Sequence, residues 1–153
     1  MLFRSRLRLE HPILSNQELE KIRSINIKGY KSKTIDITYK KGLGKEGLTK
    51  ALDKICKESL KAIDKGYSFI ILSDKNITSD KLALSTLLAC STVHNFLVKK
   101  EKRTQIGIVL ETSSDAYIDS LLIYWIGSPH EDPLWHRLQS GIKKLEEYAQ
   151  LDN

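Results

Sequence analysis

Along the first three quarters of this chain, short apolar runs typical of β-strands take turns with longer segments in which apolar residues recur at helical spacing. Three short apolar runs, at residues 34–38, 68–73 and 105–110, have the length and composition of β-strands. Each pair of runs is separated by a long segment in which apolar residues recur at helical spacing. This alternation predicts an α/β fold over residues 33–112, with a parallel sheet whose strands are joined by crossover helices.

Two crossover helices are expected between the runs. The first, over about residues 47–65, places its apolar side chains on one stripe and ends at Gly66, a residue suited to a left-handed C-terminal stop. The second, over about residues 80–100, is apolar around more of its circumference and is expected to be buried on more than one side. His94 falls on its stripe with Leu87 and Ser91, which favours a packing histidine.

A short helix over about residues 16–24 should precede the sheet, because Ser15 and Glu18 form a capping box. Further helices are expected over about residues 115–126 and from Asp132-Pro133 to about residue 150. The sequence thus divides into an N-terminal arm and short capped helix (residues 1–30), an α/β core (residues 31–126) and a C-terminal helical segment (residues 127–153). The apolar residues of the arm, Phe3, Leu7 and Leu9, predict a surface that needs a partner.

The length and composition are typical of one soluble domain. The sequence has 153 residues, no apolar stretch long enough to span a bilayer and no signal-peptide core, so we expect a cytoplasmic protein with no membrane contact. The net charge of +6 raises the question of nucleic-acid binding. The nineteen lysines are interleaved with acidic residues and only six arginines are present, which indicates solvated helix faces and argues against a nucleic-acid partner.

No metal site is indicated by the candidate ligands. Cys56 and Cys90 both fall in expected helices and belong to no Cys-x-x-Cys pair, so buried free thiols are expected. His130, Glu131 and His136 lie close in sequence, but their spacing does not bring both histidines to one helix face, and Pro133 interrupts them.

The best local signal for binding chemistry is a literal G-x-G-x-x-G, formed by Gly42, Gly44 and Gly47, between a strand and a helix. Backbone amides there could hold a pyrophosphate at the helix N-terminus, with Asp74 where a ribose-binding acid would stand. The preceding strand, however, alternates like a half-exposed edge strand, and Lys40 and Lys41 separate it from the first glycine.

The carboxyl ends of the strands are the other candidate site, because ligands bind there in open α/β sheets. Ser73-Asp74 and Glu111-Thr112 end two of the expected strands, and two carboxylates at that edge could act as acid and base. Polar residues at strand ends also cap helices or contact water, and neither a nucleophile nor a histidine stands beside this pair.

Five collinear blocks resemble the central domain of the large subunit of glutamate synthase. They cover roughly residues 7 to 112, are more specific than any single motif, and comprise residues 7–16, 31–38, 66–74, 87–94 and 103–112. Beyond Thr112 the resemblance weakens. The resemblance implies an incomplete α/β layer that corresponds to the later part of that domain.

In that family an amidotransferase domain hydrolyses glutamine, and a barrel with FMN and an iron–sulfur cluster aminates 2-oxoglutarate to glutamate, a reaction of nitrogen assimilation. The resemblance implies that FMN and the cluster belong to domains that this sequence does not match. It implies no catalytic, cofactor-binding or metal-binding residue here. The expected role is a scaffold that contacts other glutamate synthase domains or subunits, so the isolated chain should be inactive although it resembles part of an oxidoreductase.

Two other functions stay open on the sequence alone. One is a free-standing nucleotide-binding module that uses Gly42, Gly44 and Gly47. The other is a non-catalytic protein–protein adaptor without a small-molecule site.

Overall fold

The computed structural model describes residues 7, 9, 12–27 and 29–112 of the chain. Residues 23–112 belong to one compact unit, and the described residues up to 22 belong to a second. The helices expected after residue 112, and the candidate cluster His130, Glu131 and His136, lie outside the described residues.

The larger unit is built on a sheet whose strands lie in the order β1-β2-β4-β6. The strands are β1 (Asn26–Ile27), β2 (Tyr30–Asp36), β4 (Phe69–Ser73) and β6 (Gly107–Glu111). β2, β4 and β6 run parallel, with Thr34 beside Ile71 and Ile71 beside Val109, while the two-residue β1 is antiparallel to β2. The predicted α/β fold with a parallel sheet is therefore confirmed.

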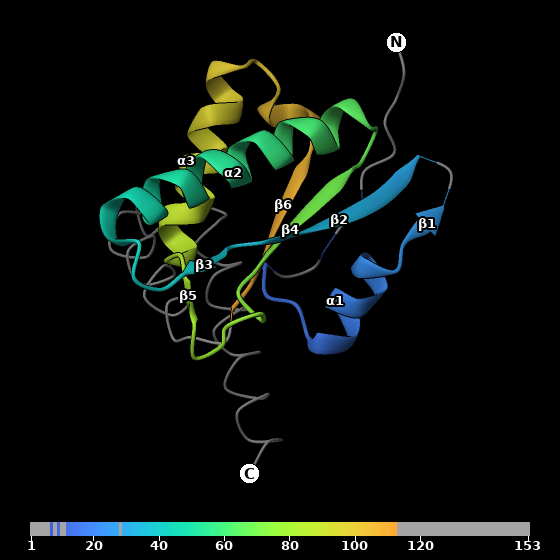
Figure 1. Ribbon diagram of the computed structural model, residues 1–153. Helices are drawn as coiled ribbons and strands as arrows, with labels where there is room; N and C mark the ends of the chain where they lie inside the picture. The colour runs from blue at the N-terminus through green and yellow to red at the C-terminus, as the bar shows by residue number, and fades with distance from the viewer. Residues whose placement is uncertain (1–6, 8, 10–11, 28, 113–153) are drawn as a thin grey trace, which may run out of the picture. The chain divides into compact units, whose positions relative to one another are not determined.

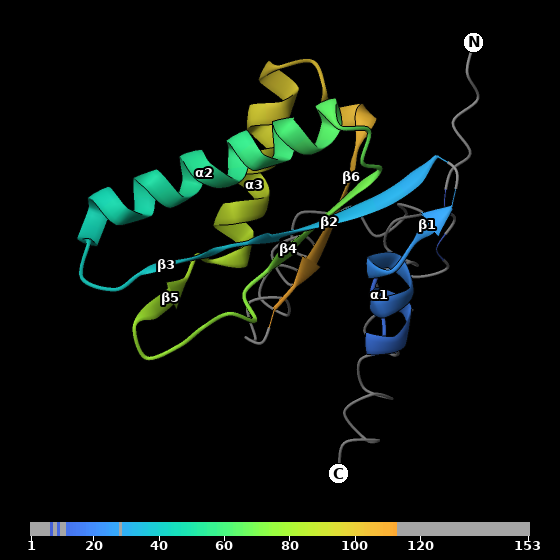
Figure 2. The same cartoon turned by 45° about the vertical axis from the view of Figure 1, so that its right-hand side comes forward.

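Two helices cover one face of the parallel strands (Figures 1 and 2). They are α2 (Gly44–Asp64), between β2 and β4, and α3 (Thr86–Lys99), between β4 and β6; a short 3-10 helix (Arg103–Gln105) follows α3. Side chains alternate along each strand, so every second strand residue faces the helices. The core between the layers contains Ile35, Ile37, Ala51, Ile55, Cys56, Ala62, Ile70, Leu72, Leu84, Ala89, Val93, Leu97 and Ile106.

A two-stranded antiparallel ribbon leaves the carboxyl edge of this sheet (Figure 2). It consists of β3 (Thr38–Lys40), which continues the chain beyond β2, and β5 (Lys81–Ala83), with Tyr39 opposite Leu82. The expectation of a helix starting near residue 80 was wrong, because α3 begins at Thr86. Residues 81–83 pair with a strand 43 positions earlier, and helical periodicity does not report such a pairing.

Burial on α3 also differs from expectation. Ala89, Val93 and Leu97 face the core, while Leu87, Ser91 and His94 form an exposed stripe. His94 is therefore not a packing histidine; its Nδ1 accepts a hydrogen bond of 2.9 Å from Nε of Arg103.

The two cysteines lie in helices, as expected. Cys56 is buried on α2 and Cys90 is half-buried on α3, and both are free thiols. Burial raises the pKa of each thiol; the charge of Asp53 raises that of Cys56 further, and the charge of Arg103 opposes the rise at Cys90.

The helix α1 (Asn16–Arg23) begins with the predicted capping box. The amide of Ser15 donates to Oε2 of Glu18 at 2.7 Å, and the amide of Glu18 donates to Oγ of Ser15 at 3.3 Å. Leu19 and Ile22 are buried, as the sequence predicts. In the arm, Leu7 and Leu9 are 43% and 44% exposed, which agrees with the expected exposed apolar arm, and Phe3 lies outside the described residues.

Candidate functional site

The polar residues at the carboxyl end of the parallel sheet form the candidate site. Ser73 and Glu111 are register partners at the ends of β4 and β6, and Asp36 is the register partner of Ser73 on β2. Ile70 and Leu72 point to the helix-covered face, so the alternation of the strand places Ser73, and with it Glu111, on the opposite face.

Glu111 is the centre of this group and is only 6% exposed. Its Oε1 accepts hydrogen bonds from Nη2 of Arg23 at 2.7 Å and from Nζ of Lys75 at 2.8 Å. Its Oε2 accepts from Oγ of Ser73 at 2.5 Å. Arg23 also donates through Nη1 to Oγ1 of Thr34 at 2.9 Å, so one guanidinium joins β2 and β6. Two cations and a hydroxyl thus surround one carboxylate.

These contacts fix the charge of Glu111. Burial by itself raises the pKa of the carboxyl, but hydrogen bonds from Lys75, Ser73 and Arg23, together with the positive charge of Arg23, lower the pKa from 4.5 to about 2. A carboxylate with so low a pKa is a weak proton acceptor at neutral pH. Glu111 is therefore suited to holding the strand ends together and poorly suited to acid–base chemistry.

The second carboxylate of the expected acid–base pair has a hydroxyl partner of its own. Asp74 is 1% exposed, and its Oδ2 accepts a hydrogen bond from Oγ1 of Thr112 at 2.7 Å. Its backbone amide continues the ladder by donating to the carbonyl of Glu111 at 3.2 Å. The strand ends therefore carry two carboxylate–hydroxyl contacts. In one, Ser73 at the end of β4 donates to Glu111 at the end of β6; in the other, Thr112 after β6 donates to Asp74 after β4. Sequence reasoning found these four residues and missed Arg23 and Lys75.

Asp36, at the end of β2, is engaged in the same way. Its Oδ1 accepts from the amide of Thr38 at 2.8 Å and from Oγ1 of Thr38 at 2.7 Å, and its Oδ2 accepts from Nδ2 of Asn76 at 3.1 Å. Burial raises the pKa of Asp36, yet these bonds and the charge of Lys81 bring the pKa below its ordinary value.

The glycine motif lies at another place, on the turn between β3 and α2. Gly42 and Gly44 have φ angles of +90° and +52°, which L-residues with side chains rarely adopt. Gly47 lies in the first turn of α2, where an added Cβ would come within 2.5 Å of Cβ of Leu43. Each glycine thus has a local backbone or packing reason. The strand that leads into the turn is β3 of the ribbon, whereas a dinucleotide-binding turn follows a central strand of the parallel sheet.

The described residues offer little for a metal or a cluster. No three His, Cys, Asp or Glu side chains within the described part of the chain are arranged to hold a metal ion. An iron–sulfur centre takes several thiolates, whereas the whole sequence has two cysteines, on different helices, and this donor set does not fit such a cluster. No helix among the described residues is long and apolar enough to cross a membrane.

We call the polar residues at the carboxyl end of the parallel sheet the polar rim. The fold and the polar rim define a parallel α/β layer whose strand-end carboxylates accept hydrogen bonds from neighbouring side chains. The sequence profile of the glutamate synthase central domain matches residues 3–123, and the chain belongs to this family. The match extends past Thr112, where the resemblance was expected to weaken.

Named relatives agree with the family match. The chain is 36% identical over 113 residues to glutamate synthase [NADH] of Schizosaccharomyces pombe and 34% identical over 109 residues to glutamate synthase [NADH] of Saccharomyces cerevisiae. It is 33% identical over 107 residues to the glutamate synthase [NADPH] large chain of Bacillus subtilis. These alignments cover 70–72% of this chain but only 5–7% of each relative.

Proposed function

We propose that this chain is a linking scaffold of a glutamate synthase in the cytoplasm and that it contributes no catalytic residue of its own. Its partners would be the other domains or subunits of that enzyme, which turn glutamine and 2-oxoglutarate into glutamate. FMN and the iron–sulfur cluster would be bound by those partners.

The observation that carries this proposal is that the carboxylates of the polar rim already bind neighbouring side chains. The family match identifies the layer, and the strand ends are where a ligand would bind in such a sheet. There Glu111 is occupied by Arg23, Lys75 and Ser73, and Asp74 accepts a hydrogen bond from Thr112. Side chains that are already bound to one another favour a structural role over a reactive one.

A direct assay of the isolated chain tests the absence of catalysis. The purified 153-residue chain, incubated with glutamine, 2-oxoglutarate and a chemical reductant, should form no glutamate. Formation of glutamate, or release of ammonia from glutamine alone, would overturn the proposal. A sample with the full-length Bacillus subtilis large chain serves as the positive control for the assay.

The native state of the polypeptide tests the scaffold role itself. Size-exclusion chromatography of the native protein, followed by absorbance spectroscopy, should find the chain in a longer polypeptide or a complex that contains flavin. A lone small protein without flavin would contradict the linking role and indicate a remnant.

A nucleotide-binding module is the second candidate, and it depends on the open backbone around Gly42 and Gly44, where an added Cβ would meet nothing within 4 Å. Titration calorimetry with NAD, FAD and ATP separates the two functions. Micromolar binding that Gly44→Val abolishes would favour the nucleotide module. No heat with any of the three would favour the scaffold.

A further inference from the structure

The strand β6 has one paired edge and one open edge. Within the described residues it pairs with β4 alone, and it is the last strand in the order β1-β2-β4-β6. Residues 107–110 of β6 are half-buried, whereas the register partners of residues 108–110 on β4, Ile70, Ile71 and Leu72, are fully buried. The open edge therefore leaves apolar strand surface exposed.

The backbone of β6 shows which groups face the open edge. The amide of Gly107 donates to the carbonyl of Ser68 at 2.8 Å, so Gly107 directs its backbone toward β4. Backbone direction alternates along a strand, and Val109 therefore also faces β4. The N–H and C=O groups of Ile108 and Leu110 point the other way. These groups need hydrogen-bond partners from another strand or from water.

The open edge lacks the usual protection against pairing with a further strand. Natural edge strands are often very short or carry lysine or proline. The sequence of β6 is Gly-Ile-Val-Leu-Glu, and its one charged side chain, Glu111, is already bound by Arg23 and Lys75. The strand at the other end of the sheet, β1, has only two residues. The edge of β6 is therefore the one suited to pairing.

The flank of α3 above the open edge is exposed as well. The carbonyl of Ile106 points away from β4, because the amide that follows it points toward β4, and it accepts from Nη1 of Arg103 at 2.9 Å. Nε of the same arginine donates to Nδ1 of His94 at 2.9 Å, which places His94 on the flank of α3 nearest the open edge. Leu87 and Val98 lie on the stripe of His94 and are 43% and 50% exposed.

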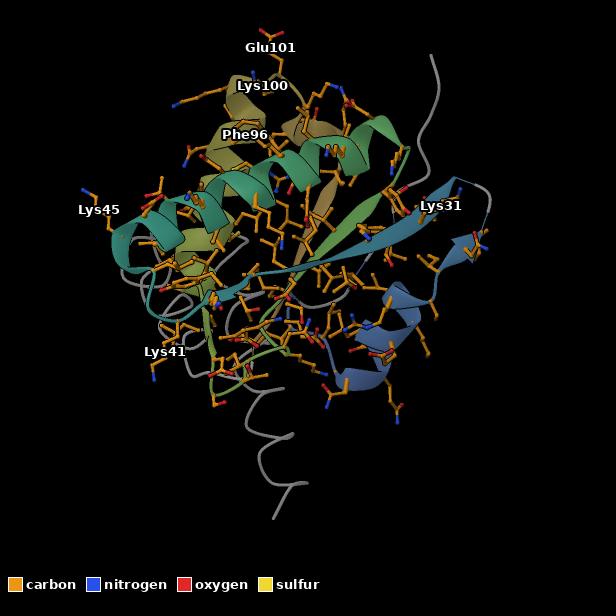
Figure 3. The ribbon with its side chains drawn as sticks, in the orientation of Figure 1. Lys31, Lys41, Lys45, Phe96, Lys100 and Glu101 are labelled. Atoms are coloured by element: carbon orange, nitrogen blue, oxygen red, sulfur yellow. The ribbon has the colours of Figure 1, made fainter. Side chains whose placement is uncertain are left out.

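The opposite flank of α3 is covered. Phe96 is two residues from His94 and therefore points to the other side of the helix. Phe96 packs against the core, and Nζ of Lys100 lies 5.8 Å from the centre of its ring (Figure 3). The exposed stripe of His94 and the open strand edge thus lie on the same side of the α/β layer.

We propose that a second copy of this chain pairs with the open edge of β6, so that two four-stranded sheets join through an antiparallel β6–β6 pair. A two-fold axis passes beside Val109, which lies opposite Val109 of the second copy. Ile108 of each copy lies opposite Leu110 of the other, and their outward N–H and C=O groups form the new hydrogen bonds. Self-association goes beyond the scaffold role, and its test uses no glutamate synthase activity, so its failure would leave that role to its own experiments.

A second copy supplies both kinds of surface that the open side lacks. Its β6 is a strand with apolar side chains on both faces, like the one it would pair with. A two-fold axis perpendicular to the sheet keeps the helices of both copies on one face. The two exposed stripes of α3 would then flank the new strand pair and cover the half-buried side chains of Ile108 and Leu110.

Charge favours the antiparallel arrangement. A parallel pair would bring the two Arg103 side chains together, at the amino ends of both strands. An antiparallel pair separates them and sets each Arg103 beside the end of the sheet that holds Asp74 and Glu111. Glu111 lies opposite Gly107 of the second copy, so like charges do not meet across the pair.

The contact of Arg103 selects the register. A pair centred on Ile108 would need the carbonyl of Ile106, which Arg103 already binds. A pair centred on Val109 uses the outward groups of residues 108 and 110 in both copies and leaves that carbonyl to the arginine.

Analytical ultracentrifugation of the full chain tests the pairing. The mass should approach that of two chains as the concentration is raised to about 100 µM. The mass of a single chain throughout this range would overturn the proposal and leave the open edge to a different polypeptide or to residues 113–153.

Lysines placed at opposite ends of the sheet locate the contact. Val109→Lys sets like charges across the two-fold axis and should weaken the dimer about tenfold or more. Ile27→Lys is the matched control, because it adds the same charge to β1, where Ile27 is 67% exposed, and it should leave the dimer unchanged. Circular dichroism and unfolding midpoints check the fold of both variants. Unchanged dimerisation of a folded Val109→Lys protein, or an equal loss in both variants, would reject the edge of β6 as the contact.

Single cysteines test the register independently of the lysine variants. Val109→Cys places two thiols opposite each other at a non-hydrogen-bonded pair, where the Cα atoms are about 4.5 Å apart and a disulfide can form. Leu110→Cys is the control, because it faces Ile108 of the second copy. Mild oxidation should cross-link two chains of the first variant and not of the second, as seen on a non-reducing gel. The wild type, with Cys56 buried and Cys90 half-buried, is the blank. Equal cross-linking of both variants, or none with Val109→Cys, would overturn the proposed pair.

Discussion

Arg23 and Glu111 are 88 positions apart in the sequence, yet Nη2 of the arginine lies 2.7 Å from Oε1 of the glutamate. Arg23 is the residue at which the larger unit begins, and Glu111 is the last residue of β6. Their contact therefore joins the first and last parts of the described sheet unit. The same guanidinium reaches Thr34 on β2, so the pair also bridges the strands on both sides of β4.

The stability of the fold should depend on pH through Glu111. Its pKa of about 2 lies below the ordinary 4.5, so its ionised form stabilises the folded state at any pH above about 4.5. This contribution, roughly 3 kcal/mol, is lost as the pH falls through the folded-state pKa of about 2. Urea unfolding at intervals between pH 6 and pH 2 should show the decline.

Glu111→Gln is the control for the pH dependence. At pH 7 it should lower the free energy of unfolding by about 2–4 kcal/mol, because it leaves the Arg23 charge without its nearest carboxylate. Its stability should fall less than that of the wild type between pH 4.5 and pH 2. Parallel pH profiles of the two proteins would show that Glu111 is not the group responsible.

The two cations around Glu111 should differ in importance. The side chain of Arg23 is 28% exposed and also bonds Thr34, whereas that of Lys75 is 62% exposed. Arg23→Met should therefore cost about 1.5–3 kcal/mol of unfolding free energy, and Lys75→Met less than about 1 kcal/mol. Chemical denaturation of both variants measures the difference, and equal costs would contradict the assigned geometry.

Leu72 provides a test of the layer packing. Its side chain is fully buried between the sheet and the helices, so Leu72→Ala should destabilise the protein by about 2–5 kcal/mol through lost burial and a cavity. Val98→Ala, at a half-exposed site on α3, should change the stability by less than about 0.5 kcal/mol. Thermal and urea unfolding report both values.

Gly47 should resist a substitution that is favourable in most helices. Gly47→Ala would bring a new Cβ within 2.5 Å of Cβ of Leu43, so we expect a loss of about 1 kcal/mol or more in place of the usual gain in helix propensity. Adding Leu43→Gly removes the opposing atom and should restore the stability, whereas adding Leu43→Ala keeps that atom and should not. The unfolding midpoints of the single variant and the two double variants show whether steric contact with Leu43 causes the loss of stability.

The parallel sheet was predictable because the pattern of each apolar run is local and shows within a few neighbouring residues. The runs that form β4 and β6 are typical of buried strands, and α2, which precedes β4, follows a clear helical period. β5 was missed since its three residues become a strand only through pairing with β3, a contact between distant positions. Residues 78–80, Thr-Ser-Asp, resemble a helix start, although the helix begins at Thr86, after Ser85.

The candidate site was predictable in its position and not in its chemistry. Ser73, Asp74, Glu111 and Thr112 follow from strand ends alone. The partners of Glu111 do not, because Arg23 lies 88 residues away and Lys75 lies in a loop. Without those cations, the carboxylates of Asp74 and Glu111 read as an acid–base pair. With them, Glu111 is an ionised carboxylate that Arg23 and Lys75 bind in place.

Neighbours in the parallel sheet are also successive along the chain, since β2, β4 and β6 lie side by side in that order. A nascent or refolding polypeptide can therefore add each strand to an edge that its predecessor has just formed, and no insertion between existing strands is needed. The contact of Glu111 with Arg23 requires β6, the last strand among the described residues, so its formation reports the addition of that strand to the sheet.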